Sequence, residues 1–535
     1  MPDHRSETHA GSPPRVSFPR CYNAAADLVD RHLEAGQGDR VAYYDASGRH
    51  TYADLAERAA RMGNALSSLG VEREQRIALL LLDTVDFPAA FLGSLRAGVV
   101  PVLLNTLLTP KDYAYMLSDS RAALVIVSDA LLPKLEAALA ELPEKPRVLV
   151  ADSPLGESDD WKARAEYVSL AEVLAAASPH LSPTSTTPDD VAFWLYSSGS
   201  TGAPKGTVHL HSHLMQTAVL YAQGVLQIRA DDVVYSAAKL FFAYGLGNSL
   251  TFPLSVGASA VLSAGRPTPA EVARVMREYQ PSIFCGVPTL FASLLASPEL
   301  ETGVSPKLRI STSAGEALPR HVGEAWSTRF GSHILDGIGS TEMLHIFISN
   351  RHDDIRYGSS GHPVPGYQLK LVGDDGEPVP RGEEGSLWVS GPSAAAFYWN
   401  NREKSLATFH GPWTRTGDRY VCDEDGYYVY SGRADDMLKV GGIWVSPFEV
   451  ESALGEHSSV LEAAVVGHED AAGLTKPKAF VVLKPGQTPT EALEAELKAF
   501  VKQKLAPYKY PRWIEFLEEL PKTATGKIQR YRLRA

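Results

Sequence analysis

A short segment rich in small polar residues, Tyr196 to Gly206 (YSSGSTGAPKG), has chemistry suited to a polyphosphate. An apolar run, VAFWLY, precedes it, so we predict a strand that ends in a loop. Glycines let backbone N–H groups turn inward, hydroxyls add donors, and Lys205 supplies positive charge. The spacing is not that of a P-loop, because only two residues separate Gly202 from Lys205 and glycine follows the lysine. We therefore predict a phosphate-binding loop; a plain surface loop is the alternative.

Two other segments contain groups that could act on a phosphate or a metal ion. Thr341 and Glu342 follow glycine in DGIGSTE (336–342), a pattern that is also typical of a helix N-terminus. The run HLHSH (209–213) follows the phosphate segment directly. We disfavour a metal site there, because no Cys or carboxylate at ligand spacing completes it.

Alternating strand-like and helix-like segments must position these groups. Apolar runs at 76–82 and 123–128 flank an amphipathic stretch at 87–98, which predicts strand, helix and strand in a mostly parallel, helix-covered sheet. Strand-to-glycine transitions recur further on, at 282–288, 309–316 and 333–342. Ligands bind at the carboxyl edge of such sheets, so we expect the site at these loops. The Ser-, Pro- and Asp-rich segment 152–188 reads as a surface connection.

The composition of the chain excludes several classes of protein. The 535 residues suggest three or four folding units, and 44% apolar with 21% charged residues are globular values. A net charge of −12 disfavours general affinity for nucleic acid or anionic membrane. Three scattered cysteines fit a reducing compartment. With no apolar signal segment and an apolar stretch (77–105) interrupted by charges, we expect a cytoplasmic protein without a membrane span.

The composition changes near residues 431–442, beyond which helices and strands form a compact α+β set. In the helix expected at 490–505, apolar residues recur at helical spacing, which predicts a core-facing stripe. The tail from Lys498 to Ala535 has 10 Lys and Arg against 3 Asp and Glu, a local charge of +7. This tail is either a solvated basic face or a cationic module that closes over phosphates.

Five motifs occur in an order that resembles one superfamily. They are YSSGSTGAPKG, DGIGSTE, TGD (416–418), SGRADDMLK (431–439) and PKTATGK (521–527). Together they are similar to the signature loops of adenylate-forming enzymes: acyl-CoA ligases, luciferases and peptide-synthetase adenylation domains. Two further segments, LFFAYGLGNSLTFPLSVGA (240–258) and GSTEMLHIFISN (339–350), resemble the benzoate–CoA ligases in particular.

The resemblance implies an α/β fold in three parts. Residues 1–432 would form a large N-terminal domain of helix-covered, mostly parallel sheets with a small barrel-like subdomain. Residues 433–439 would form a hinge, with Asp435 at its centre. Residues 440–535 would form a small, mobile α+β domain that holds the catalytic lysine.

The implied reaction joins benzoate to coenzyme A at the expense of ATP. The carboxylate attacks the α-phosphorus to give an acyl-adenylate and pyrophosphate, and the CoA thiol then displaces AMP. Both steps build negative charge on oxygen, so they require fixed donors, Mg²⁺ and a mobile cation. By resemblance, Lys527 is the catalytic cation, with Lys522 as the less favoured alternative. Thr341 would bond the α-phosphate and Glu342 would orient the Mg²⁺.

The other site residues also follow from the resemblance. The β- and γ-phosphates would contact Ser197, Ser198, Gly199, Ser200, Thr201, Gly202 and Lys205. Adenosine would contact Gly315, Glu316, Ala317, Asp336 and Ile338, with Asp418 on the ribose and Arg433 on the ribose or α-phosphate. The family often has an aromatic residue where this chain has Ile338. The aryl ring would lie among Phe242, Ala243, Tyr244, Gly339, His345 and Ile346, and the CoA tunnel would pass Lys439, Gly441 and Gly442.

Several alternatives stay open at this point. Phe242 and Tyr244 could be core residues, and His345 could be structural or could accept a ring hydroxyl or amino group. Substituted benzoates, loading of a carrier protein and a non-catalytic nucleotide-binding module are the competing functions. The complete set of motif residues argues against a non-catalytic module, and the chain end soon after Lys527 favours a free-standing ligase, as a monomer or homodimer.

Overall fold

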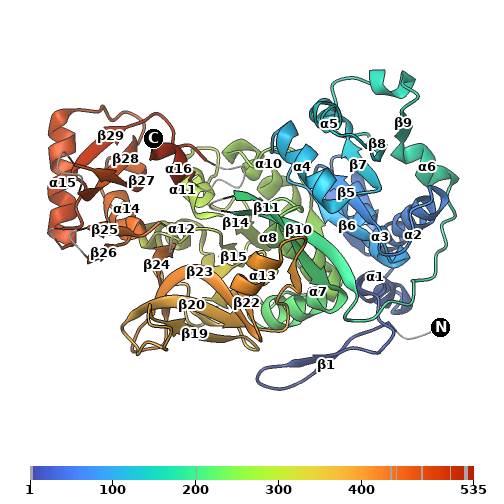
Figure 1. Ribbon diagram of the computed structural model, residues 1–535, viewed down its shortest axis with the longest axis horizontal. Coiled ribbons are helices and arrows are strands. Elements are labelled where there is room, and N and C mark those ends of the chain that lie inside the picture. Colours follow the sequence, from blue (N-terminus) through green and yellow to red (C-terminus); the bar gives the residue numbers. More distant parts are fainter. Residues whose placement is uncertain are drawn as a thin grey trace.

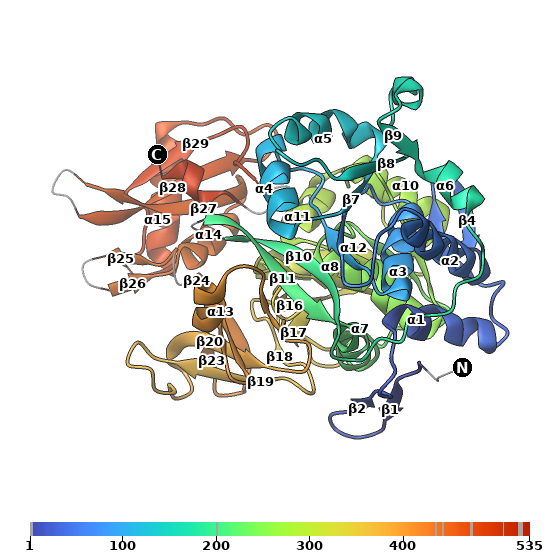
Figure 2. The same ribbon diagram turned by 45° about the vertical axis from the view of Figure 1, so that its right-hand side comes forward.

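The computed structural model describes residues 4–199, 202–433, 436–440, 443–470, 474–506, 508–522 and 528–534. Within these residues, two large sheets with their helices form the body of the molecule, and a smaller unit lies at the C-terminal side (Figure 1). An N-terminal hairpin of β1 (Glu7–His9) and β2 (Arg15–Ser17) projects from the body (Figure 2). Among the described helices, none has both the length and the apolar composition needed to cross a membrane.

The first large sheet contains the predicted parallel strands. Its strands are β5 (Arg76–Leu80), β6 (Val100–Leu103), β7 (Leu124–Ser128), β8 (Arg147–Ala151), β9 (Tyr167–Ser169), β10 (Val191–Gly199), β11 (Gly202–Leu210) and β21 (Phe397–Tyr398). Their order is β21-β11-β10-β6-β5-β7-β8-β9, and from β10 to β9 neighbours run parallel. β7 is buried throughout, which explains its continuous apolar run.

Helices cover this sheet and begin at identifiable caps. They are α2 (Tyr52–Ser68), α3 (Asp86–Ala97), α4 (Pro110–Ser120), α5 (Leu132–Leu139) and α6 (Leu170–Ala176), with 3₁₀ turns η1 (Asp129–Leu131) and η2 (Asp160–Ala163). Thr109 caps α4 through a capping box with Asp112, and proline occupies the first turn, where its missing N–H is harmless. The expected strand, helix and strand at 76–128 are therefore confirmed. The segment 152–188 is not only a surface connection, because β9 adds an edge strand and α6 packs on α2.

The second large sheet holds the strand-to-glycine transitions. Its strands are β3 (Val41–Asp45), β4 (Gly48–Thr51), β12 (Val233–Ser236), β13 (Ser259–Val261), β14 (Ile283–Gly286), β15 (Ile310–Ser313), β16 (His333–Gly339), β17 (Ile346–Ser349) and β18 (His362–Pro363). The order is β18-β17-β16-β15-β14-β12-β13-β3-β4, with β3, β13, β12, β14, β15 and β16 parallel. The ends of β14, β15 and β16 thus meet at one edge, as predicted.

Helical segments also surround the second sheet. They are α1 (Ala24–Glu34), α7 (His211–Thr217), α8 (Ala243–Leu246), α9 (Phe252–Val256), α10 (Pro269–Tyr279), α11 (Pro288–Ala296) and α12 (Arg320–Phe330). Two π-helical turns, η3 (Ala218–Gln223) and η4 (Gly247–Thr251), extend α7 and α8. Such turns are rare and occur frequently at functional sites.

An antiparallel sheet corresponds to the expected small subdomain. It consists of β19 (Gln368–Val372), β20 (Glu384–Ser390), β22 (Phe409–His410), β23 (Trp413–Cys422) and β24 (Tyr428–Arg433), with α13 (Arg402–Thr408) beside it. β24 pairs with β23 and leads the chain out of the body.

The C-terminal unit has its own hydrophobic core. Its elements are β25 (Leu438–Val440), β26 (Ile443–Val445), β27 (Val460–Glu469), β28 (Thr475–Leu483), β29 (Trp513–Phe516), α14 (Pro447–Gly455), α15 (Glu491–Lys504) and α16 (Arg530–Leu533). Leu493, Leu497 and Val501 on α15 are buried in that core, which confirms the predicted stripe. The domain boundaries at 433 and 440 stay predictions.

Candidate active site

The predicted phosphate loop is mostly a β-hairpin. β10 and β11 pair antiparallel, with Tyr196 opposite Gly206, Ser197 opposite Lys205, and Gly199 opposite Gly202. The expectation of a strand ending in a loop is therefore wrong, because residues 202–210 return along β10 and pair with β21 on their other side. Ser197 and Lys205 become cross-strand neighbours as a result. Ser200, Thr201 and the side chain of Ser198 lie outside the described residues.

Thr341 and Glu342 lie in the turn between β16 and β17, close to this hairpin. The Tyr398 hydroxyl donates to Glu342 Oε1 at 2.7 Å, and the Ser197 hydroxyl reaches the same oxygen at 3.5 Å. His209 on β11 bonds the Thr341 carbonyl through Nε2 at 2.8 Å. The alternative of a helix N-terminus is wrong, because residues 341–345 form turns and bends and lead into β17.

Burial lowers the pKa of Lys205, the lysine predicted to bind phosphate. Desolvation lowers the pKa of the half-buried Lys205 ammonium from its ordinary value, and the negative charge of Glu342 opposes that shift. The Lys205 Nζ lies 4.6 Å from the centre of the Tyr398 ring, a cation–π distance. Ser197, Lys205, Glu342 and Tyr398 thus form one cluster near the tip of the hairpin, the predicted phosphate cluster.

The predicted adenine-binding residues follow two adjacent parallel strands. Ser313 at the end of β15 is paired with Asp336 on β16, so the segment 315–317 emerges beside Asp336 and Ile338. Gly315 has a φ of +94°, a backbone conformation that favours glycine. Burial raises the pKa of Asp336 to about 8, and its Oδ1 has no hydrogen-bond partner among the described residues. A buried acceptor of this kind suits an amino-group donor.

The residues predicted for the ribose are also cross-strand partners. Asp418 on β23 lies opposite Arg433 on β24, and Arg433 Nη1 donates to Asp418 Oδ1 at 3.2 Å. Arg433 also donates to the Thr416 carbonyl at 3.3 Å. Arg433 thus forms an ion pair with another predicted site residue.

The predicted aryl-acid residues lie on α8 and on the turn that leads into β17. Phe242 and Ala243 are at the start of α8, and the Tyr244 hydroxyl lies 2.5 Å from Thr312 Oγ1. Gly339 pairs with Ile346, and a Cβ on Gly339 would lie 2.6 Å from the His345 carbonyl oxygen. Phe241 belongs to the core, whereas Phe242, Ala243 and Tyr244 are only partly buried.

His345 is surrounded by aromatic rings. Its ring centroid lies 5.2 Å from that of Tyr221 on η3, 5.4 Å from that of Tyr244, and 4.4 Å from that of Phe252. Burial lowers the pKa of His345 to about 3, so the ring is neutral near pH 7. Because Nε2 faces the Tyr244 carbonyl at 3.3 Å, Nε2 must carry the proton and Nδ1 is an acceptor. No hydrogen bond reaches Nδ1 within the described part of the chain.

Matches to known proteins agree with this arrangement of loops. Residues 30–399 match the AMP-binding enzyme family, and residues 449–527 match the AMP-binding enzyme C-terminal domain. The chain belongs to the AMP-binding enzyme family. This membership confirms the superfamily and the fold class that the five motifs predicted.

Individual relatives cover nearly the whole chain. A benzoate–CoA ligase of Thauera aromatica is 57% identical over 529 residues, 98% of each chain. A 4-hydroxybenzoate–CoA/benzoate–CoA ligase of Rhodopseudomonas palustris is 50% identical and covers 96% of this chain and 94% of its own. The crystal structure of a benzoate CoA ligase from Burkholderia xenovorans LB400 has a TM-score of 0.89 at 53% identity, covering 96% of this chain and 100% of its own.

The remaining predicted residues of this AMP-binding enzyme lie outside the described residues. These are Lys527, Asp435, Gly441, Gly442 and the side chain of Lys439. The alternative cation, Lys522, is described: its Nζ pairs with Glu462 Oε2 at 2.7 Å. Because that ammonium is already neutralised by Glu462, Lys522 is the weaker candidate.

Sequence reasoning missed Tyr398 and His209 as partners of Glu342 and Thr341. Tyr398 belongs to no predicted motif, and its position depends on the pairing of β21 with β11, which lies about 190 residues earlier in the chain. His209 was weighed only as a metal ligand. It follows the phosphate motif directly, and this proximity in sequence is the signal that could have found it.

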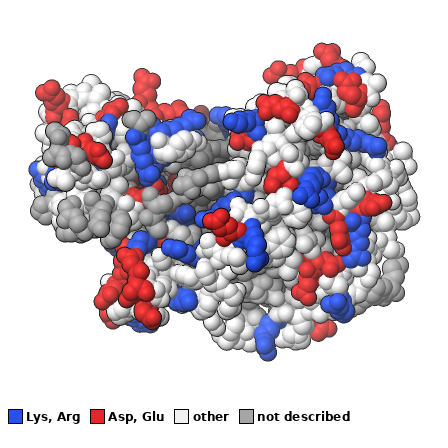
Figure 3. All heavy atoms as spheres, in the orientation of Figure 1, with Lys and Arg blue, Asp and Glu red and all other residues white. Residues whose placement is uncertain are grey.

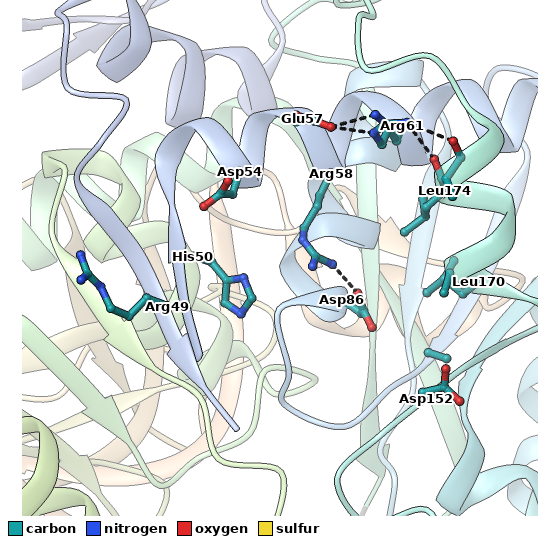
Figure 4. A pocket seen from close by; sticks show the side chains of 13 residues that line it. Arg49, His50, Asp54, Glu57, Arg58, Arg61, Asp86, Asp152, Leu170 and Leu174 are labelled. Carbon is teal, nitrogen blue, oxygen red and sulfur yellow. Dashed lines mark hydrogen bonds and ion pairs between the residues drawn. The ribbon is translucent and has the colours of Figure 1, made fainter. Parts of the chain in front are cut away.

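The surface has a cluster of basic side chains and, apart from it, a cavity. Lys and Arg side chains gather along the hollow between the C-terminal unit and the body (Figure 3). A cavity of about 550 Å³ lies elsewhere, lined by α2, α3 and α6 (Figure 4). There Arg58 pairs with Asp86 at 3.2 Å and Arg61 with Glu57 at 2.8 Å, so these two cations already have partners. The cavity includes no predicted site residue.

Proposed function

We propose that this enzyme ligates benzoate to coenzyme A in two steps, through benzoyl-adenylate, with AMP and pyrophosphate as the other products. One observation supports the proposal above the others. The segment from Gly339 to Ile346 contains Thr341 and Glu342 on the phosphate side and His345 on the aromatic side. A ring held against His345 can thus present its carboxylate toward the phosphate cluster. The identity of 57% to a benzoate–CoA ligase supports the same substrate.

In the first step, a benzoate oxygen attacks the α-phosphorus of ATP and the bond to the pyrophosphate oxygen breaks. Lys205 and the Ser197 hydroxyl bind the departing β- and γ-phosphates, and Thr341 donates to the α-phosphate. Asp336 accepts a hydrogen bond from the adenine amino group, and Asp418 accepts two from the ribose hydroxyls. Lys527 supplies the cation that stabilises charge developing at the α-phosphate.

Glu342 has the chemistry expected of a Mg²⁺ ligand. Mg²⁺ prefers oxygen donors and is commonly bound by one or two carboxylates together with substrate phosphates. Both side-chain hydrogen bonds to Glu342 reach Oε1, and within the described residues none reaches Oε2. When bound there, Mg²⁺ would neutralise phosphate charge.

In the second step, the sulfur of CoA attacks the carbonyl carbon of benzoyl-adenylate, and AMP leaves with the bonding electrons. The hinge at Asp435 would exchange the Lys527 segment for the segment 439–442 between the two steps. Gly441 and Gly442 would leave room for the pantetheine arm.

Hydroxy- and aminobenzoates are a second candidate class of substrate. The observation that favours them is the buried Nδ1 of His345, which has no hydrogen-bond partner among the residues that the structure describes. It can accept a hydrogen bond from a ring O–H or N–H. A fluoro substituent cannot donate such a bond, so it does not gain from this contact.

A panel of acids tests the proposal. We would measure CoA-dependent AMP release with ATP and Mg²⁺ for benzoate, hydroxy-, amino- and fluorobenzoates, cinnamate, acetate and a medium-chain fatty acid. The highest kcat/KM on benzoate supports the first candidate, and the highest on a hydroxy- or aminobenzoate supports the second. Activity on aliphatic acids or cinnamate alone would contradict the aryl pocket at Tyr244 and His345.

A further inference from the structure

Tyr398 occupies a fixed place between the phosphate hairpin and Glu342. It lies on β21, where it pairs with Thr207 of β11. Neighbouring backbone bonds hold this strand on both sides of it, from Ala396 N to the Val208 carbonyl at 2.9 Å and from Trp399 N to the Gly206 carbonyl at 2.8 Å. The side chain is 3% exposed. The ring therefore has little freedom to move relative to β11.

The Tyr398 hydroxyl restricts the orientation of the Glu342 carboxylate. It donates to Oε1 at 2.7 Å, a short hydrogen bond to a carboxylate. A carboxylate can only accept, so the phenol O–H is the donor in this contact. The Glu342 backbone is held as well, because Ala395 N donates to its carbonyl at 2.7 Å. Oε2 is left as the oxygen without a hydrogen bond in the described part of the chain.

The ring of the same tyrosine contacts the phosphate-binding lysine. Lys205 Nζ lies 4.6 Å from the ring centre, on the strand that Tyr398 pairs with. The electron-rich face of the ring attracts the ammonium, and a half-buried site strengthens this attraction. Tyr398 thus contacts the predicted metal ligand, Glu342, through its hydroxyl, and the predicted phosphate-binding lysine, Lys205, through its ring.

We propose that Tyr398 is a positioning residue for Mg²⁺–ATP: its hydroxyl aims Glu342 at the metal ion, and its ring holds Lys205 for the phosphates. This inference rests on the proposed function only through the binding of Mg²⁺–ATP, since it needs neither benzoate nor CoA. Hydrogen-bonded partners of metal ligands typically contribute 10- to 100-fold to metal affinity.

Calorimetric titration with the non-hydrolysable analogue α,β-methylene-ATP separates the two contributions. We expect Tyr398→Phe to raise the Kd of the Mg²⁺ complex about 10- to 100-fold and to leave the Kd in EDTA unchanged. We expect Tyr398→Leu, which also removes the ring, to raise the Kd in EDTA about two- to fivefold above the wild-type value. In both variants, the Mg²⁺ concentration needed for half-maximal adenylation should rise by a similar factor. The rate of thioester formation from supplied benzoyl-adenylate should not change.

Tyr22→Phe is the matched control. Tyr22 is also fully buried and donates to a carboxylate, Asp27 Oδ2, at 3.0 Å, and it lies outside the site. It should leave both Kd values at the wild-type level. A wild-type Kd for the Mg²⁺ complex in Tyr398→Phe, or equal weakening with Mg²⁺ and in EDTA, would overturn the positioning role alone. If the wild-type protein binds no Mg²⁺–nucleotide complex, both this inference and the proposed function are overturned. An unexpected acid preference in the panel would affect only the proposed function.

Discussion

The predicted aryl-acid pocket and the predicted phosphate cluster differ in the kinds of side chain that form them. The pocket around His345 consists of neutral rings from α8, η3 and α9, packed against one turn of the second sheet. The phosphate cluster brings together charged and hydroxyl groups from β10, β11, β21 and the same turn, with hydrogen bonds between them. The surroundings of His345 are therefore apolar and uncharged, whereas the cluster places charged and hydroxyl groups within hydrogen-bond or cation–π distance of one another.

This difference assigns separate consequences to substitutions in each region. A change in the phosphate cluster should slow adenylation by the same factor for every acid, because all acids react with the same ATP. A change in the pocket should alter the choice of acid and leave ATP binding intact. Both regions include residues of the segment 339–346. Substitutions near this one segment can therefore test whether the choice of acid and the binding of ATP are independent.

The largest effect is expected from Lys527→Ala. Removal of a donor that stabilises transition-state charge typically costs 10²- to 10³-fold in rate, so acyl-adenylate formation should fall by about that factor for every acid. Thioester formation from supplied benzoyl-adenylate should be spared. Pyrophosphate release and single-turnover thioester formation, measured separately, distinguish the two steps.

Lys522→Ala is the control for that experiment. Its ammonium pairs with Glu462 at the surface of the C-terminal unit, so we expect less than a twofold change in adenylation. Equal loss of both half-reactions in Lys527→Ala would refute the division of labour between them.

An intermediate effect, specific to the acid, is expected from Gly247→Ala. A Cβ at Gly247 would lie 2.7 Å from His345 Nε2 and 2.9 Å from the Phe252 ring, so the His345 ring must move. Overpacking of this kind costs about 1 to 3 kcal/mol of folding stability. Because it also displaces a wall of the predicted pocket, it should lower kcat/KM for benzoate by up to about 10²-fold. The Kd of the Mg²⁺–nucleotide complex should not change.

Gly265→Ala provides the matched control, because a Cβ there meets no atom of the described residues within 4 Å. It should leave both kcat/KM and nucleotide affinity at the wild-type level. Weakened nucleotide binding in Gly247→Ala would show that the pocket and the cluster are not separable.

The smallest effect concerns the pH dependence of stability, where His345 of the predicted aryl-acid pocket and Asp336 of the predicted adenine site act in opposite directions. The pKa of His345 is lowered to about 3 by burial, so between about pH 3 and 6.5 the unfolded state binds a proton that the folded state does not. The contribution of His345 to the free energy of unfolding therefore falls as the pH falls through that window. The pKa of Asp336 is raised to about 8, so between about pH 4 and 8 the folded state retains a proton, and its contribution rises as the pH falls.

Thermal unfolding at pH 5 and pH 7 measures these opposing contributions. His345→Phe should reduce the loss of stability on acidification, and Asp336→Asn should increase it, each by up to about 1.4 kcal/mol per pH unit. If wild type and both variants lose the same stability between pH 7 and pH 5, the shifted pKa values of these two buried groups would be contradicted.

Much of the fold was predictable because strand and helix periods are local signals. The parallel strands at 76–128, the transitions that end β14, β15 and β16, and the stripe on α15 were all predicted from such patterns. The loop expected at Tyr196–Gly206 was wrong, since a glycine-rich segment gives no local sign of the strand that will pair with it. The edge strand β9 was missed for the same reason: three residues are too few for a period.

The sequence alone determined the family and the set of candidate groups, because five ordered motifs predict which loops would hold the phosphates, the nucleoside and the catalytic lysine. The tertiary structure decided which of these groups meet. Glu342 is oriented by Tyr398, Thr341 by His209, and Asp418 by Arg433, and each of these partners lies on a different strand or turn. Sheet pairing between segments far apart in the chain creates these contacts, and hydrogen-bond geometry over a few ångströms has no counterpart in sequence spacing.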